Sequence, residues 1–270
     1  MPAESTGPDD RSAEPPIPEP HIIVRSMDIA YGSFVLIRDL DFTIQRGDIF
    51  VIMGGSGCGK SSLMRQLIGL KRPTCGQVLY EGESFWEASE QRRSQLMQRF
   101  GILYQQGALW SSMTLAENVA LPISEYTDLG QGEIDDLIAL KLALVGLAGF
   151  EDYYPSEISG GMRKRAGLAR AMALDPDVLF FDEPSAGLDP ISSKRLDDLI
   201  LELRDSLGAT VIMVTHELPS IFAIANHSVF LDPVSKSMVA SGDPHELLAT
   251  CQDRRVQDFL TRGGEGPGHE

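Results

Sequence analysis

The sequence predicts an α/β fold, in which helices pack on a largely parallel sheet. Four short, continuous apolar runs are typical of strands buried on both faces, and they lie at residues 49–53, 101–104, 178–181 and 210–214. Helical patterns of charged and apolar residues separate several of these runs along the chain. A glycine-rich segment follows the first run and leads into a helical pattern, which is the order expected for a phosphate-binding loop.

The glycine-rich segment fits the pattern G-x-x-x-x-G-K-[ST] without a mismatch. Its residues are Gly54, Gly55, Ser56, Gly57, Cys58, Gly59, Lys60 and Ser61, followed by Ser62. The glycines let backbone N–H groups face one point, and the positive end of the following helix lies behind it. We expect Lys60 to reach the β- and γ-phosphates of a nucleotide and the Ser61 hydroxyl to ligate Mg²⁺. A glycine turn with an incidental Lys-Ser pair is the alternative, which the flanking strand and helix disfavour.

Composition restricts the class of protein. The chain has 270 residues, which suits one large α/β domain with a subdomain, and 43% of them are hydrophobic. The formal net charge is −16, so we expect neither nucleic acid nor bare anionic lipid as an autonomous partner. No apolar run in the sequence reaches the length of a membrane span. The three cysteines, Cys58, Cys75 and Cys251, form no disulfide framework and suit a reducing cytosol.

Both ends of the chain are expected to be disordered. Residues 1–20 are acidic and proline-rich, unlike a secretory signal, and residues 263–270 are glycine-rich. After the first of these segments, strand patterns occur at 22–24, 34–37 and 40–44. Tyr31 lies at a turn between them, where it is either a rim residue or a flat surface on which an adenine stacks.

A polar segment follows the predicted strand at 101–104. Gln105 stands directly after this strand, where a glutamine is most often a polar loop residue. Trp110 and Met113 are large apolar groups in the same loop, and they either fill the core or form a docking surface for another protein. Thr114 and Glu117 have the spacing of a capping box, which begins the next helix.

A second glycine-rich helix start lies at 158–162. Ser159 is a predicted N-cap, and Gly160 and Gly161 expose N–H groups at the start of the helix. This segment is either a capped helix and nothing more, or a second phosphate-binding element. The second interpretation makes sense if two copies of the chain face each other head to tail. Each nucleotide then lies between the phosphate loop of one copy and this element of the other.

Two carboxylates follow the apolar strand at 178–181, at the end of a strand where open α/β sheets bind ligands. Asp182 is predicted to support Mg²⁺, and Glu183 to polarise the attacking water. His216 follows the strand at 210–214 and is either structural or a sensor of the γ-phosphate. The intervening helix at 192–207 is predicted to bury Leu196, Leu199, Ile200, Leu203 and Leu207.

Together these segments resemble the ATP-binding subunits of ABC transporters over nearly all of residues 21–262. The motifs that carry the resemblance are Walker A at 54–61, the Q-loop at Gln105, the signature at 158–162, Walker B at 178–182, the D-loop at 185–189 and the switch His216. The resemblance implies ATP and Mg²⁺ as cofactors, with Lys60, Glu183 and His216 as catalytic residues. It also places Tyr31, Ser62, Gln105 and Asp189 on the nucleotide, and it makes Gln105 a further Mg²⁺ ligand beside Ser61 and Asp182.

The fold that this resemblance implies is a P-loop NTPase (RecA-like) core with two additions. One is a small antiparallel β subdomain near the N-terminus, and the other is a helical subdomain from about residue 87 to 173 that carries the signature. Together they make one ATPase domain at 21–262, between the extension at 1–20 and the tail at 263–270.

A narrower resemblance is to the Mla (maintenance of lipid asymmetry) subgroup, whose ATPases drive permeases paired with MCE proteins. The residues that carry it are 106–110, the variant signature ending in Met162, and the tail at 255–260 followed by Gly266 and Pro267. It implies a second copy of the chain, integral-membrane permease subunits, and small STAS-domain and MCE substrate-binding subunits as partners. It also implies a peripheral position on the cytoplasmic face of the inner membrane, and coupling to the permease through residues 105–124.

Three other functions are weighed against phospholipid transport. An importer of polar solutes served by a binding protein would use the same site. A soluble ABC ATPase of DNA repair or translation usually needs paired cassettes or a long inserted coil, and the sequence contains neither. A GTPase switch is disfavoured because the sequence has no Asn-Lys-x-Asp guanine motif.

Overall fold

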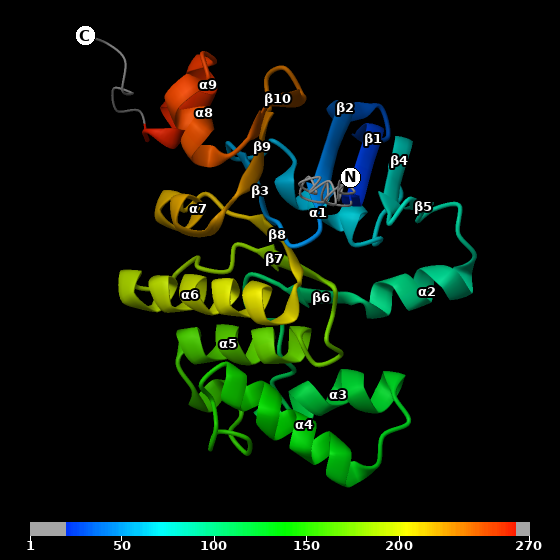
Figure 1. Cartoon of the computed structure of the whole chain (residues 1–270), viewed down its shortest axis with the longest axis vertical. Helices are drawn as coiled ribbons and strands as arrows, with labels where there is room; N and C mark the ends of the chain where they lie inside the picture. The colour runs from blue at the N-terminus through cyan, green and yellow to red at the C-terminus, as the bar shows by residue number, and fades with distance from the viewer. Residues whose placement is uncertain (1–19, 263–270) are drawn as a thin grey trace, which may run out of the picture.

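The computed structural model of this chain describes residues 20–262, and its two sheets and their helices confirm the predicted α/β fold (Figure 1). The predictions for 1–19 and 263–270 concern residues outside that range. Pro20, which we assigned to the N-terminal extension, is the first residue of a strand.

The larger sheet has six strands in the order β10-β9-β3-β8-β7-β6. These are β3 (Ile49–Gly54), β6 (Phe100–Leu103), β7 (Val178–Asp182), β8 (Thr210–Val214), β9 (His227–Asp232) and β10 (Ser237–Gly242). All neighbours are parallel except β9 and β10. The central strands β3 and β8 are buried along their whole length, which explains their continuous apolar runs.

The smaller sheet is antiparallel, in the order β2-β1-β4-β5. Its strands are β1 (Pro20–Tyr31), β2 (Phe34–Gln45), β4 (Cys75–Tyr80) and β5 (Glu83–Ser84). The patterns at 34–37 and 40–44, which we predicted as two strands, form the single strand β2. The pairing of β1 with β2 has several register shifts, and Asp39 between the two patterns has a positive φ of 51°. An irregular but continuous strand therefore replaces the predicted break.

Nine α-helices and one 3₁₀ turn complete the described residues. They are α1 (Lys60–Leu67), α2 (Glu90–Gln98), α3 (Leu115–Tyr126), α4 (Gln131–Leu144), the turn at Pro155–Glu157, α5 (Gly160–Ala171), α6 (Pro190–Leu207), α7 (Leu218–Ile224), α8 (Pro244–Thr250) and α9 (Arg254–Leu260). Among residues 20–262, no helix combines the length and apolar character needed to cross a bilayer.

The six-stranded sheet separates two hydrophobic cores. On one face, Phe50, Ile52 and Phe180 pack with α1 and the antiparallel sheet. On the other face, Val51 and Phe181 pack with the helices from α3 to α9. The alternation along β3 and β7 sends neighbouring residues into different cores. In Figure 1, α1 lies between the two sheets, and α3, α4 and α5 gather at the end of the molecule away from the antiparallel sheet.

Two details differ from the expected helical pattern. Leu207, predicted to be buried, is 43% exposed because it is the last residue of α6 and lies beyond the part of the helix that packs on the core. The segment at 87–173 contains β6, a strand of the large parallel sheet. The chain therefore leaves the sheet after β6 and returns to it at β7, with α3, α4 and α5 between.

Candidate active site

The phosphate loop joins β3 to α1, and its glycines are required by its backbone. Gly54 has φ of 142°, and a Cβ there would lie 2.3 Å from the carbonyl oxygen of Leu231. Gly59 caps α1 with φ of 104°, and a Cβ there would lie 2.7 Å from Ile37 Cδ1. Any larger residue would strain the backbone and displace neighbours, so the loop holds its shape only with glycine at these two positions.

The side chains of the loop differ in their contacts and in their exposure. Lys60 Nζ donates to the carbonyl oxygens of Gly54 at 2.8 Å and Gly55 at 3.0 Å, so the ammonium lies against the loop itself. Cys58 is buried, and burial raises the pKa of its thiol, which keeps it protonated. Cys58, a predicted nucleotide ligand, could therefore contact a nucleotide only through its backbone. The side chain of Ser56, another predicted ligand in this loop, is exposed.

Tyr31 is hydrogen-bonded to the first turn of α1. Its hydroxyl lies 3.0 Å from Ser62 Oγ, and this hydrogen bond is the largest cause that lowers the pKa of Tyr31. The Lys71 ammonium lies 3.1 Å from the centroid of the ring, and the residue is 44% exposed. A cation on one face leaves the other face for stacking, so an adenine could stack on one side of this ring only. Ser61 is exposed in the first turn of the same helix.

The two predicted carboxylates lie at the end of β7. Burial, followed by the neighbouring charge of Glu183, raises the pKa of Asp182, and Arg65 and Lys60 oppose this shift. Glu183 has a positive φ of 51°, which is strained for a residue with a side chain. Its Oε1 lies 2.8 Å from His216 Nδ1, so the structure brings these two predicted residues into contact. Its Oε2 is buried and has no hydrogen-bond partner among the described residues.

Gln105 is exposed in the loop after β6. The Arg170 guanidinium on α5 donates to the carbonyl oxygens of Gly107 and Ala108, at 3.2 and 2.6 Å. The buried Asn118 of α3 accepts from the N–H of Trp110 at 2.7 Å and donates to the carbonyl oxygens of Trp110, Met113 and Thr114. These contacts hold the part of the loop that follows Gln105, and no motif in the sequence pointed to Arg170 or Asn118.

Trp110 and Met113, predicted either to fill the core or to form a docking surface, differ in burial. Trp110 is 58% exposed, although its backbone is fixed by Asn118, whereas Met113 is partly buried. The capping box predicted for Thr114 and Glu117 is confirmed at the start of α3.

The second glycine-rich element begins α5. Ser159 Oγ accepts from the Met162 N–H at 3.2 Å, which confirms its predicted role as N-cap, and Gly160 and Gly161 are the first two residues of the helix. Asp189 caps α6 by accepting from the N–H groups of Ile191 and Ser192, each at 3.0 Å.

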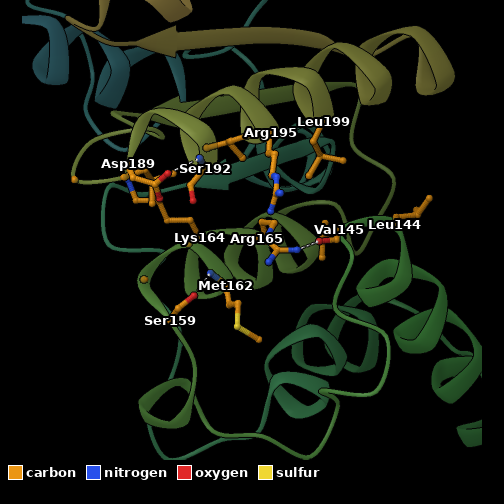
Figure 2. Close-up of a pocket in the computed structure, with 15 residues that line it drawn as sticks. Leu144, Val145, Ser159, Met162, Lys164, Arg165, Asp189, Ser192, Arg195 and Leu199 are labelled. Atoms are coloured by element: carbon orange, nitrogen blue, oxygen red, sulfur yellow. Dashed lines mark hydrogen bonds between the residues drawn. The ribbon is translucent and has the colours of Figure 1, made fainter.

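A cavity of about 620 Å³ lies between α5 and α6 (Figure 2). Ser159, Gly160, Gly161 and Asp189 line it, and none of residues 54–62 does. Within the described chain, the cavity at the second glycine-rich helix start therefore does not extend to the glycine-rich loop at 54–62. The predicted residues fall into two groups, one around the phosphate loop, Asp182, Glu183 and His216, and one around the signature and Asp189.

This fold and these two groups define a nucleotide-hydrolysing P-loop protein that carries two separate glycine-rich helix starts. The family model described as "ABC transporter" matches residues 37–186, which is more than half of the chain. The chain belongs to the ABC transporter family, and it is an ATPase that binds nucleotide.

Two curated relatives share nearly the same percentage of identical residues with this chain. It is 39% identical over 244 residues to the "Intermembrane phospholipid transport system ATP-binding protein MlaF" of Escherichia coli, covering 90% of each protein. It is 40% identical over 246 residues to the "Probable ribonucleotide transport ATP-binding protein mkl" of Mycobacterium tuberculosis, covering 91% of this chain and 68% of that protein. The first of these relatives confirms the narrower resemblance to the Mla subgroup.

A solved structure supports the fold. The chain superposes on cbiO1 from Clostridium perfringens, described as part of the ABC transporter complex cbiONQ, with a TM-score of 0.79 and 25% identity. The match covers 90% of this chain and 97% of that one. The core and both additions therefore follow the architecture of an ABC transporter ATPase.

Proposed function

We propose that the chain drives phospholipid transport by hydrolysing ATP between two of its own copies. The observation that carries the catalytic half of this proposal is the Glu183 carboxylate, which has one oxygen on His216 and one oxygen with no partner among the described residues. A carboxylate held at one oxygen presents the other to a water molecule in a defined direction. Glu183 would orient the attacking water, and His216 would sense the γ-phosphate.

The separation of the two glycine-rich helix starts supports a dimeric site. Each nucleotide would lie between the phosphate loop of one copy and Ser159, Gly160 and Gly161 of the other, with Asp189 close to the junction. Lys60 and the loop N–H groups would neutralise the phosphates, and Tyr31 would stack on the adenine with the face opposite Lys71.

The donors near the phosphate loop fit Mg²⁺. They are oxygens from Ser61 and Asp182, with Gln105 as a further proposed ligand, and oxygen is the kind of ligand that this ion prefers. One protein carboxylate with phosphate oxygens and waters is a common set. Burial and then the charge of Glu183 raise the pKa of Asp182, and a bound cation would offset both effects. The ion, when bound, supplies charge neutralisation at the phosphates. Within 20–262, no three or more His, Cys, Asp or Glu side chains are grouped so that they could hold a metal ion by themselves. ATP would therefore supply part of the coordination.

The proposed contact with the membrane partner lies on the segment at 105–124 and its surroundings. A groove of about 520 Å³ there is lined by Tyr104, Leu121, Pro122 and Tyr126 among others. Tyr104, Leu121 and Tyr126 are exposed although they are apolar or aromatic, as expected of a protein interface. Because Arg170 joins this loop to α5, a permease segment in the groove would act on both the Gln105 loop and the signature helix.

The proposed partners and location follow from the Mla subgroup. They are integral-membrane permease subunits of the MCE-associated type, with MCE and STAS-domain subunits, at the cytoplasmic face of the inner membrane. The balanced coverage of the MlaF relative supports phospholipid as the substrate. The mkl relative, named for ribonucleotide transport, supports a second candidate, a transporter of polar solutes.

The experiment that separates these candidates is a pull-down of the tagged full-length chain from detergent-solubilised native membranes, with mass spectrometry of proteins and lipids. We expect a multi-span permease, an MCE protein and bound phospholipid. A permease recovered with a soluble solute-binding protein would replace the lipid by a polar solute and leave the catalytic assignments in place. Recovery without any membrane protein would overturn the transport proposal.

A further inference from the structure

Lys164 is a buried lysine on the signature helix α5 that the motif pattern does not assign. Its side chain lines the cavity of Figure 2, and the residue is only 7% exposed. The ammonium donates to the carbonyl oxygens of Pro184 at 2.6 Å and Ala186 at 2.5 Å, and it lies 3.4 Å from that of Glu183. The three carbonyls belong to the segment that runs from the proposed catalytic carboxylate into the D-loop.

The surroundings of Lys164 make this contact specific. The three N–H donors of Lys164 are directed at backbone carbonyls. Burial lowers the pKa of Lys164, and the nearby Glu183 carboxylate opposes that shift. A buried ammonium is costly unless its hydrogen bonds are made, so these carbonyls and Lys164 depend on one another.

The segment that Lys164 holds is irregular. Glu183 has φ of 51° and Gly187 has φ of 76°, so the chain turns twice within five residues. These turns bring several carbonyl oxygens to one side, where their partial negative charges repel each other. Ser185 offers no compensating contact, because its hydroxyl is buried without a hydrogen-bond partner in the part of the chain described. A cation at the centre of the three carbonyls removes the repulsion and closes the turn.

We propose that Lys164 is a positioning residue for ATP hydrolysis, which fixes the peptide after Glu183 and thereby the direction of the Glu183 carboxylate. This inference rests on the proposed role of Glu183. Because Lys164 belongs to α5, it also ties the signature helix to the catalytic segment within one copy. A small shift of a catalytic group is enough to lower a rate strongly, so the effect appears in turnover before it appears in nucleotide binding.

The test uses full-length chain in the complex recovered from membranes, and compares Lys164→Met with Lys141→Met. Lys141 is the matched control, since it is a second buried lysine, in α4, whose ammonium pairs with Asp175. Loss of charge-assisted hydrogen bonds should lower kcat of Lys164→Met on the order of 10- to 100-fold, with KM for ATP changed less than about 3-fold. Lys141→Met should lower thermal stability and keep kcat within about 3-fold of wild type.

Two further variants make the outcome decisive. Lys164→Arg keeps the charge and the donors, and it should regain at least about 10-fold of the lost kcat. A wild-type kcat in Lys164→Met, or a loss no larger than that of Lys141→Met, would overturn the positioning role. Glu183→Gln is measured in parallel. If Glu183→Gln turns over at the wild-type rate, the proposed function fails; if it is inactive while Lys164→Met is normal, only this inference fails.

Discussion

Glu183, the proposed residue that orients water, has both its backbone and its carboxylate fixed by neighbouring segments. It follows the buried strand β7 directly, its backbone is left-handed, and its N–H donates to the Val214 carbonyl at 2.8 Å. The neighbouring strand β8 therefore fixes the backbone of Glu183, while His216, just beyond the end of β8, contacts its carboxylate. Two adjacent parallel strands thus supply both the proposed base and its partner.

A buried histidine gives a prediction for stability. His21 in β1 is 2% exposed, and its Nδ1 lies 2.6 Å from Thr210 Oγ1. Burial, followed by the charge of Arg46, lowers the pKa of His21 from 6.5 to about 4. The charges of Glu81 and Asp177 oppose this shift. Between these two values the unfolded chain takes up a proton that the native state excludes. We therefore expect stability to fall as the pH falls from 6.5 toward 4.

The measurement is the urea midpoint of unfolding of wild type and His21→Gln across this pH range. Glutamine cannot take up a proton, so the variant should lose less stability than the wild type between about pH 7 and about pH 5. Equal losses in both proteins would show that His21 does not contribute to the pH dependence.

At the scale of elements, α5 contacts two loops besides carrying the signature motif. Its N-terminus carries the signature, Lys164 reaches the D-loop segment, and Arg170 holds the Gln105 loop. Gly167 lets the helix approach that same loop closely, because a Cβ there would lie 2.9 Å from the Gly107 carbonyl oxygen. The helix therefore touches both the nucleotide side and the proposed permease side of the molecule.

Gly167→Ala tests this close approach. Alanine favours helix formation, but the added methyl would push the Gly107 backbone away, so we expect destabilisation by about 1–3 kcal/mol. ATP hydrolysis should fall further than the loss of folded protein explains, since the Gln105 loop is displaced. Denaturant unfolding and ATPase rates measure the two effects.

Gly132→Ala is the control for this helix substitution. Gly132 lies in the first turn of α4, and a Cβ there would meet no atom within 4 Å. This change should stabilise the protein by about 0.5–1 kcal/mol and leave ATPase activity unchanged. A Gly167→Ala protein that is as stable and active as Gly132→Ala would contradict the packing argument.

At the scale of the whole molecule, the proposed nucleotide site is divided between two copies of the chain. The signature residues and Asp189 line a cavity to which no residue of 54–62 contributes. We therefore expect ATP to join two copies when hydrolysis is blocked.

The test is the mass of Glu183→Gln in solution by light scattering. Adding ATP and Mg²⁺ should double the mass from the monomer value of 29.5 kDa. Gly160→Asp in the same background should prevent the doubling, because a carboxylate would face the phosphates at the start of α5. A Cβ at this position would lie 3.7 Å from Arg163 Nη2, an ordinary contact with the end of a flexible side chain, so the substitution should not disturb folding. ATP-dependent doubling in the Gly160→Asp protein would contradict the head-to-tail arrangement.

The sequence by itself determined the fold class and the positions of both glycine-rich helix starts. Continuous apolar runs predict buried parallel strands, and the need for positive φ restricts Gly54 and Gly59, so both signals are local. The tertiary structure alone decided which distant groups meet. The contact of Glu183 with His216, the carbonyls held by Lys164, the loop held by Asn118 and the side of Tyr31 covered by Lys71 all join residues from different segments. No local pattern encodes these pairs, because they depend on how the strands and helices pack in space.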